Sequence, residues 1–250
     1  MESKRLLECL DADFTRLRAV AAATHLTARV PSCPEWTVAD LVRHVAAVYL
    51  HKVECMRLGG PPDPWPPAGL DEEEPLSLLD RSFAALSAEF AARTPESHAF
   101  TWYEPDQTVG FWVRRMAQET VIHRVDAELG AGAPVADIPT DLAHDGIDEF
   151  LVAFVAYGAK TWPDEYADTL AAADGRAVRI ETDDTAWLVR PTTESVEVRV
   201  SDVDAAAAVV RGAPADVLLW AWNRIGDDRV TISGAIDAVA YLRRVMAAGS

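Results

Sequence analysis

The sequence predicts an α + α/β two-domain protein, in which a four-helix bundle is followed by a smaller α+β domain. Two observations support this fold class. Apolar side chains recur at three- and four-residue spacing up to about residue 129, which is the period of amphipathic helices. After residue 175 apolar and polar residues alternate, which is typical of half-buried strands. We expect the bundle to span residues 1–158 and the second domain to span residues 159–250.

Length and composition limit the class of protein. The chain has 250 residues, of which 50% are hydrophobic and 25% charged, the profile of a soluble globular protein. Its net charge of −17, from 40 acidic and 23 basic side chains, argues against a nucleic-acid partner. No apolar run is long enough for a membrane span, and the charged N-terminus leads into an amphipathic helix rather than a signal peptide. We therefore expect a cytoplasmic protein with no membrane partner.

The first predicted helix covers residues 3–28, where apolar residues recur on one face. Pro31 and Pro34 follow, and they predict a stiff, extended loop over residues 30–36.

The second helix has clear start and stop signals. Thr37 is a typical N-cap, and Asp40 lies three residues later, where it faces the first-turn amides. The pattern runs to Leu58 and ends at Gly59.

A third helix is predicted over residues 73–92 and a fourth over residues 109–129, where Gly130 stops it. The proline-containing segment 93–107 between them reads as an irregular connection.

The rest of the chain predicts a mixture of helices and strands. The turn-rich segments 130–139 and 161–175 flank one further helix, and Asp183 and Asp184 form a plausible hairpin turn. Residues 205–210 fit either a strand or a helix. The remaining predicted helices are 140–158, 213–225 and 235–246, and the predicted strands are 176–180, 185–189, 195–200 and 230–233.

A stripe of the fourth helix carries the residues most suited to chemistry. Its members follow the spacing i, i+4, i+7, i+11: Trp112, Met116, Glu119 and His123. A carboxylate on a core-facing stripe is costly unless it is paired or binds a metal. We therefore interpret Glu119 and His123 as two ligands of a metal ion.

The second helix offers the third ligand. His44 and His51 lie on one face of it, and spacing alone does not choose between them. Imidazole and carboxylate ligands suit zinc, nickel or iron, and three protein ligands leave an open position for catalysis. We expect Asp40 to orient His44 and Arg115 to steady Glu119. The alternative is that these side chains are ordinary polar residues of the core.

Other catalytic classes have little support. Cys9, Cys33 and Cys55 form no CxxC pair, so we expect small buried or half-buried thiols, with a nucleophilic cysteine as the alternative. Neither a nucleophile elbow nor a glycine-rich phosphate loop occurs.

Three segments resemble one known family. Residues 30–44 are similar to the opening motif of mycothiol-dependent maleylpyruvate isomerase-like proteins, which belong to the DinB-like metalloprotein superfamily. Residues 119–127 resemble the same family's Glu-x-x-x-His-Arg-x-Asp-Ala motif. Residues 211–220, with Arg224, resemble its C-terminal sterol-carrier-protein-like domain.

The resemblance implies a DinB-like bundle that binds a divalent metal, usually zinc, through His44, Glu119 and His123. It also implies mycothiol as cofactor, with its sulfur at the open metal position. A coordinated thiol loses its proton and becomes a nucleophile. The remaining histidines match no ligand position of the family: His25, His51, His98 and His144.

The function that this resemblance implies is that of a metal-dependent, actinobacterial-type isomerase or S-transferase, in which a thiolate attacks a small electrophile. For a cis-enedioyl substrate, addition, bond rotation and elimination give isomerisation. The alternatives are a non-catalytic metal-binding or ligand-binding sensor or carrier of the same fold, and a metal enzyme that uses another thiol or water. The electrophile, the native metal and the choice between monomer and homodimer stay open.

The family also places a functional arginine in the C-terminal domain, and Arg224 is the matching residue. It would clamp a carboxylate of substrate or cofactor. The sequence departs from the family here, because Asn223 replaces the common glycine, and a structural role for Arg224 is the alternative. We expect Trp36, Trp102 and Trp112 to wall the pocket or to lie in the core.

Overall fold

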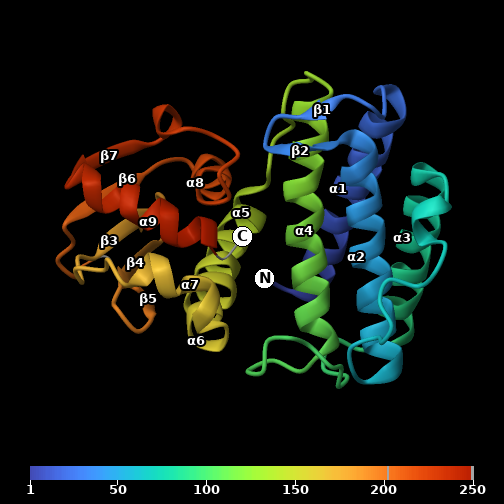
Figure 1. The fold of residues 1–250 in the computed structure, drawn as a ribbon, viewed down its shortest axis with the longest axis horizontal. Helices are drawn as coiled ribbons and strands as arrows, with labels where there is room; N and C mark the ends of the chain where they lie inside the picture. Colours follow the sequence, from blue (N-terminus) through green and yellow to red (C-terminus); the bar gives the residue numbers. More distant parts are fainter. Residues whose placement is uncertain (202, 249–250) are drawn as a thin grey trace. The chain divides into compact units, whose positions relative to one another are not determined.

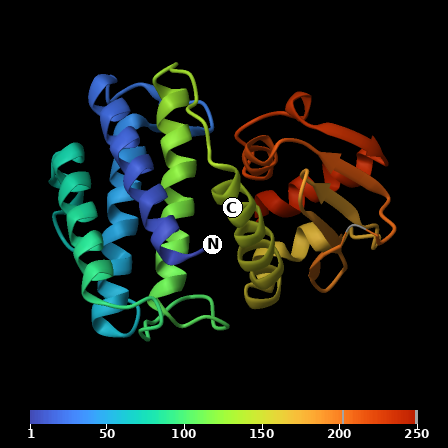
Figure 2. The same ribbon diagram turned by 180° about the vertical axis from the view of Figure 1, so that it is seen from behind.

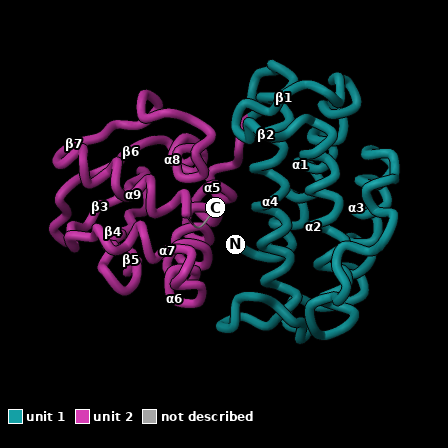
Figure 3. Tube along the Cα trace, viewed as in Figure 1, with its two compact units in different colours: residues 1–136 teal, residues 137–250 magenta. Residues whose placement is uncertain are grey.

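A computed structural model describes residues 1–201 and 203–248. The chain forms two compact units, residues 1–136 and 137–250 (Figure 3). The predicted fold class is confirmed, since the first unit is helical and the second combines helices with a mixed sheet. The unit boundary differs from the expected one, because the helical segment that begins at residue 140 packs against α8 (Pro214–Ala221) of the second unit.

The first unit is built on four long helices (Figure 1): α1 (Ser3–Ala23), α2 (Val38–Leu58), α3 (Pro75–Ala92) and α4 (Val109–Gly130). Helix α1 packs against α4, and α2 packs against both α3 and α4; Figure 2 shows the bundle from behind. Their apolar stripes meet in a closed core, where Leu17, Val45 and Val121 are fully buried. Burial of these stripes is the main source of the stability of the bundle.

The ends of α2 follow the sequence closely. Thr37 and Asp40 form the predicted capping box, and Gly59 closes the helix in the left-handed conformation with φ 67°. Helix α1 is shorter than predicted, because Thr24 is already extended. Where a loop was predicted, β1 (Arg29–Val30) and β2 (Cys33–Thr37) form a small antiparallel sheet.

The two long connections of the bundle are mostly irregular. A 3-10 turn, η1 (Leu70–Glu72), precedes α3, which begins at Pro75 because the carboxylate of Glu74 caps its first amides. Residues 93–108 contain one isolated bridge, between His98 and Thr108, and otherwise follow the predicted irregular path.

The second unit contains a five-stranded sheet of order β5-β4-β3-β6-β7. The pair β3–β6 is parallel and the other pairs are antiparallel. The strands are β3 (Val178–Glu181), β4 (Ala186–Pro191), β5 (Val196–Val200), β6 (Ala208–Arg211) and β7 (Thr231–Gly234). The helical segments are α5 (Thr140–Glu149), the π-helix η2 (Phe150–Ala156), α6 (Tyr157–Thr161), α7 (Pro163–Leu170), α8, the 3-10 turn η3 (Asp227–Arg229) and α9 (Ile236–Ala248).

The structure decides one open prediction for this unit and revises two others. The ambiguous segment 205–210 contributes strand β6, whose parallel partner β3 lies far away in the sequence. The single helix predicted over 140–158 is interrupted by the π-helix η2. Helix α7 was not predicted, because its small residues resemble a loop and only Pro163 at its first position signals a start.

Within the described residues, no helix has both the length and the apolar character that crossing a membrane requires.

Candidate metal centre

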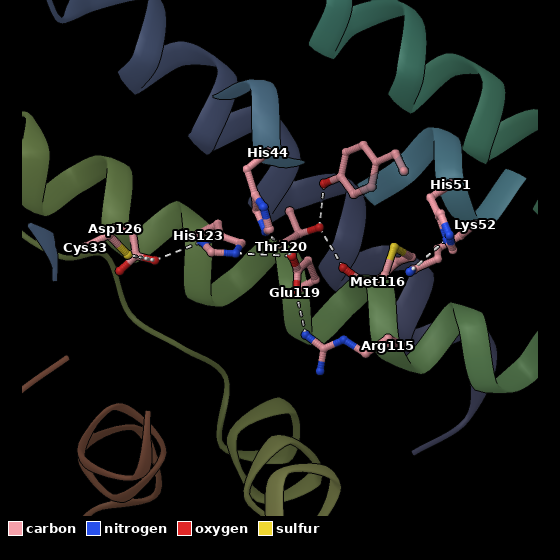
Figure 4. Close-up of polar contacts among 11 residues, drawn as sticks. Cys33, His44, His51, Lys52, Arg115, Met116, Glu119, Thr120, His123 and Asp126 are labelled. Carbon is pink, nitrogen blue, oxygen red and sulfur yellow. Dashed lines mark hydrogen bonds and ion pairs between the residues drawn. The ribbon is translucent and has the colours of Figure 1, made fainter. Parts of the chain in front are cut away.

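Three donor side chains converge between α2 and α4 (Figure 4). The imidazole of His44 comes from α2, and Glu119 and His123 lie one turn apart on α4. Nε2 of His44 lies 3.1 Å from Oε1 of Glu119, and Nε2 of His123 lies 3.2 Å from the same oxygen. One donor atom from each residue lies within 4.8 Å of the others. The structure therefore brings together the three residues predicted as ligands and places His51 outside this cluster.

A buried hydrogen bond fixes the register of these two helices. The hydroxyl of Thr120 donates to the carbonyl of Met116 at 2.6 Å, so it accepts from the hydroxyl of Tyr49, also at 2.6 Å. Tyr49 and Thr120 are fully buried, and Thr120 follows Glu119 directly in the sequence. This contact holds α2 against α4 beside the three donors.

Neighbouring side chains orient two of the donors. Arg115 donates from Nη2 to Oε2 of Glu119 at 2.8 Å, as the sequence predicted. Nδ1 of His123 lies 2.9 Å from Oδ2 of Asp126, whose other oxygen accepts from the hydroxyl of Ser32 at 2.6 Å. Asp126 was not predicted as a partner of His123. Its i+3 position after that histidine, within the recognised motif, was the available signal.

Asp40 does not orient His44 as predicted. Its Oδ2 accepts from the backbone N–H of Thr37 at 2.8 Å and from the Thr37 hydroxyl at 2.6 Å. The need to cap the first turn of α2 therefore decides where this carboxylate points.

Only one of the three predicted wall tryptophans lies at the donors. The ring of Trp36 is 4.7 Å from that of His44 and 6.1 Å from that of His123, measured between centroids. Trp112 is instead buried with its indole N–H bonded to the carbonyl of Phe100, and Trp102 packs on Phe111.

The charges at the centre suit a cation. Burial opposes the ionisation of Glu119, but His123, His44 and Arg115 outweigh it and hold the pKa of that carboxyl well below its usual range. Burial also opposes the protonation of His123, but Glu119 and Asp126 raise its pKa to about 9. The protein thus places a positive charge among these donors by protonating His123. Two imidazoles and one carboxylate are also the ligand set of catalytic zinc centres, so the residues present fit a divalent cation.

The remaining histidines lie outside this cluster. Nδ1 of His51 is 3.2 Å from Nζ of Lys52 and 3.5 Å from Sγ of Cys55. His144 bonds to the hydroxyl of Thr182 in the second unit, and His25 is exposed. Among the described residues Cys9, Cys33 and Cys55 form no disulfide; Cys9 and Cys55 are buried, and Cys33 is half-buried.

Arg224 follows the C-terminus of α8 in a Schellman motif. The N–H of Arg224 bonds to the carbonyl of Leu219, and that of Asn223 bonds to the carbonyl of Trp220. Asn223 has φ 61°, the left-handed conformation that glycine adopts most easily and asparagine tolerates. The replacement of glycine therefore preserves the turn before Arg224, whose Nη1 donates to the carbonyl of Trp222 at 2.6 Å.

Comparison with known proteins identifies similar domains and folds. The family described as the mycothiol maleylpyruvate isomerase N-terminal domain matches residues 7–128, and the MDMPI C-terminal domain matches residues 141–240. Two crystal structures, of the mycothiol-dependent maleylpyruvate isomerase and of a mutant of it, share the fold. They are 19% and 17% identical, with TM-scores of 0.63 and 0.64, and each alignment covers 93% of both chains. No curated protein matches the sequence.

Proposed function

Because the chain belongs to the mycothiol maleylpyruvate isomerase family through both of its domains, we propose that it is a metal-dependent, mycothiol-using isomerase or S-transferase that acts on a small electrophile. The observation that carries this proposal is the convergence of His44, Glu119 and His123, whose donor atoms lie within 4.8 Å of one another. The partners are a low-molecular-weight thiol and the electrophile, and cysteines that form no disulfide agree with a reducing cytoplasm.

The proposed ligand set is His44, Glu119 and His123, and zinc is the metal that it suits best. When bound, a divalent cation supplies the positive charge that lowers the pKa of a thiol sulfur. Arg115 holds one oxygen of Glu119, which leaves the other oxygen between the two imidazoles.

The tautomer of His123 is part of this proposal. The buried carboxylate of Asp126 accepts hydrogen bonds, so it keeps a proton on Nδ1 and leaves Nε2 directed at the donor cluster. The ring of Trp36 packs against that of His44, with 4.7 Å between the centroids, and so restricts the orientation of this imidazole. These contacts orient the ligands before a cation binds. Less conformational entropy is then lost when the cation binds.

We assign to Arg224 the role of binding a carboxylate of the electrophile or cofactor. A guanidinium offers paired N–H donors that match a carboxylate, and the Schellman turn at Asn223 holds its backbone in one conformation. An Arg224→Lys variant keeps the charge and loses the paired geometry. We expect it to raise KM for a carboxylate-bearing electrophile while leaving metal content unchanged.

The proposal is tested by metal analysis and by turnover. Purified wild-type protein should contain one divalent cation per chain, whereas His44→Ala and His123→Ala should each lose it. His51→Ala, which changes a histidine of the same helix outside the cluster, should retain it. Maleylpyruvate and other electrophiles are then offered with mycothiol, glutathione or bacillithiol singly. Turnover of an electrophile with mycothiol, but not with the other two thiols, supports the proposal. If no thiol gives turnover, a non-catalytic binding protein is favoured.

A further inference from the structure

The outer edge of β5 carries backbone groups that can pair with another strand. β5 ends the sheet on one side, and its only strand partner among the described residues is β4 (Figure 1). The N–H of Ser201, directly after β5, donates to the carbonyl of Ala186 at 2.9 Å. Inward and outward residues alternate along an antiparallel pair, so the N–H and C=O groups of Val196, Val198 and Val200 point away from β4. The described part of the chain provides no hydrogen-bond partner for these outward groups.

β5 lacks the features by which proteins usually block an exposed edge. Its residues include no proline, and its register against β4 is continuous, without a bulge. Three of its five residues are valines, which favour strands. Val200 is 67% exposed, although it lies on the same side of the strand as the buried Val196. A further strand at this edge would cover the side chain of Val200.

The sequence of β5, Val-Glu-Val-Arg-Val, is complementary to itself in the antiparallel direction. When Val198 of one copy faces Val198 of a second copy, Val196 faces Val200 and Glu197 faces Arg199 on both sides of the two-fold axis. The valines then exchange backbone hydrogen bonds across the edge. Glu197 and Arg199 form the closer, non-hydrogen-bonded pairs, in which opposite charges stabilise and like charges destabilise.

Both charged side chains are available for this contact. Glu197 and Arg199 are exposed. Glu197 forms no ion pair within the part of the chain that the structure describes, although Arg190 lies opposite it on β4. Arg199 lies 3.3 Å from Asp204, but an ion pair between two exposed side chains stabilises little and exchanges readily.

We propose that β5 pairs antiparallel with β5 of a second copy of this chain, and that the resulting two-fold symmetric dimer joins the two sheets into one. The apolar side of each sheet continues across the interface, where Val200 of each copy packs beside Val196 of the other. An interface built on one pair of short strands is small, so we expect a dissociation constant on the order of 10 µM. The donor cluster belongs to the first unit and β5 to the second, so the inference does not depend on the proposed function.

The experiment measures the mass of the full-length protein by analytical ultracentrifugation between about 1 and 200 µM. Glu197→Arg and Arg199→Glu each place like charges opposite one another at both cross-strand contacts, and the double variant restores opposite charges. Val200→Pro removes an outward N–H that β4 does not use, a change that an edge strand tolerates. Val200→Thr keeps that N–H and is the matched control. Circular dichroism and the Tm show whether each variant is folded.

We expect wild-type protein to change from monomer to dimer over this range. Each single charge variant and Val200→Pro should raise the dissociation constant at least about tenfold, whereas the double charge variant and Val200→Thr should stay within about threefold of wild type. A wild-type protein that is still monomeric at about 200 µM overturns the inference. It is also overturned if the single charge variants and Val200→Pro dimerise as wild type does, or if the folded double variant does not regain the dimer that the single charge variants lose.

Discussion

His123 donates a hydrogen bond from Nδ1 to Asp126, with 2.9 Å between the two atoms, so one carboxylate on α4 sets the tautomer of a proposed metal ligand on the same helix. Asp126 is fully buried, and its second oxygen accepts from Ser32, which lies in the tight connection between β1 and β2. The short sheet before α2 is thereby tied to the donor cluster.

Asp126→Ala should weaken metal binding about 10- to 100-fold, because the ring of His123 loses the acceptor that fixes its orientation. Competition with a chelator of known affinity measures this change. Ser32→Ala is the matched control, since it removes one bond to Asp126 and leaves the bond between Asp126 and His123 in place. Its effect on affinity should be several-fold smaller. Equal affinities of Asp126→Ala and wild-type protein would contradict a positioning role for Asp126.

Metal binding should tighten as the pH rises toward 9. Burial lowers the pKa of His123, but Glu119 and Asp126 outweigh it and raise the pKa to about 9 in the metal-free protein. Below that pH a cation must displace the proton of His123, so the apparent affinity should fall about 50-fold from pH 9 to pH 7, with a slope that approaches tenfold per pH unit. Chelator competition at a series of pH values measures the slope. A flat profile over this range would mean that His123 is not a ligand.

The same shift makes the stability of the metal-free protein depend on pH. The pKa of His123 is raised from 6.5 in the unfolded chain to about 9 in the folded one. Its stabilising contribution is therefore complete below pH 6.5 and is lost as the pH rises through 9. We expect the Tm of metal-free protein to decrease over this range and His123→Gln to flatten that decrease. A metal-free Tm that instead rises between pH 7 and 9 would contradict the assignment of the proton to His123.

The sequence predicted the parts of the centre that depend on local geometry. Glu119 and His123 are one helical turn apart, so their common direction follows from the period of the helix. The capping of α2 by Thr37 follows in the same way from neighbouring residues. The choice of His44 over His51 depends on the register of α2 against α4, which the contact between Tyr49 and Thr120 fixes. Spacing within one helix contains no information about that register.

Features that depend on distant residues were missed or left open. Strand β6 pairs in parallel with β3, and local alternation does not show whether such a partner exists. The bond between Asp126 and Ser32 joins segments far apart in the chain, so the pattern of neighbouring residues did not predict it. The cavity that His44 lines together with residues 65–71 likewise depends on segments that are far apart in the chain.

Arg124→Met should destabilise the protein by about 3–5 kcal/mol without reducing metal content at saturation. The guanidinium is buried, donates to Asp13 at 3.0 Å and to Glu128 at 2.7 Å, and also bonds to the carbonyl of Ala136. Its loss leaves two carboxylates in the interior without this partner, and burial already raises the pKa of Asp13. Urea unfolding of the metal-free protein measures the change.

The matched control for Arg124 is Arg18→Met. Arg18 forms a bidentate pair with Asp80 on the surface of the bundle, where water and salt screen the attraction. Its removal should lower the free energy of unfolding by no more than about 1 kcal/mol. If the two variants lose similar amounts of unfolding free energy, burial does not make the Arg124 network more stabilising than a surface ion pair.

Alanine substitutions at two glycines of the second unit distinguish the effect of backbone strain from that of steric clash. Gly234 and Gly175 both lie in the left-handed region, with φ 87° and φ 76°. A Cβ on Gly234 would collide with the backbone of Ala207 and come within 2.9 Å of Cα of Ala208, whereas a Cβ on Gly175 meets nothing within 4 Å. Gly175→Ala should therefore cost only the strain of about 1–2 kcal/mol, partly offset by a less flexible unfolded chain. Gly234→Ala must also displace strand β6 from β7, so we expect a loss of about 2–5 kcal/mol in thermal or urea unfolding. Equal effects of the two substitutions would mean that the close pairing of β6 with β7 contributes little, and a smaller effect at Gly234 would contradict the pairing itself.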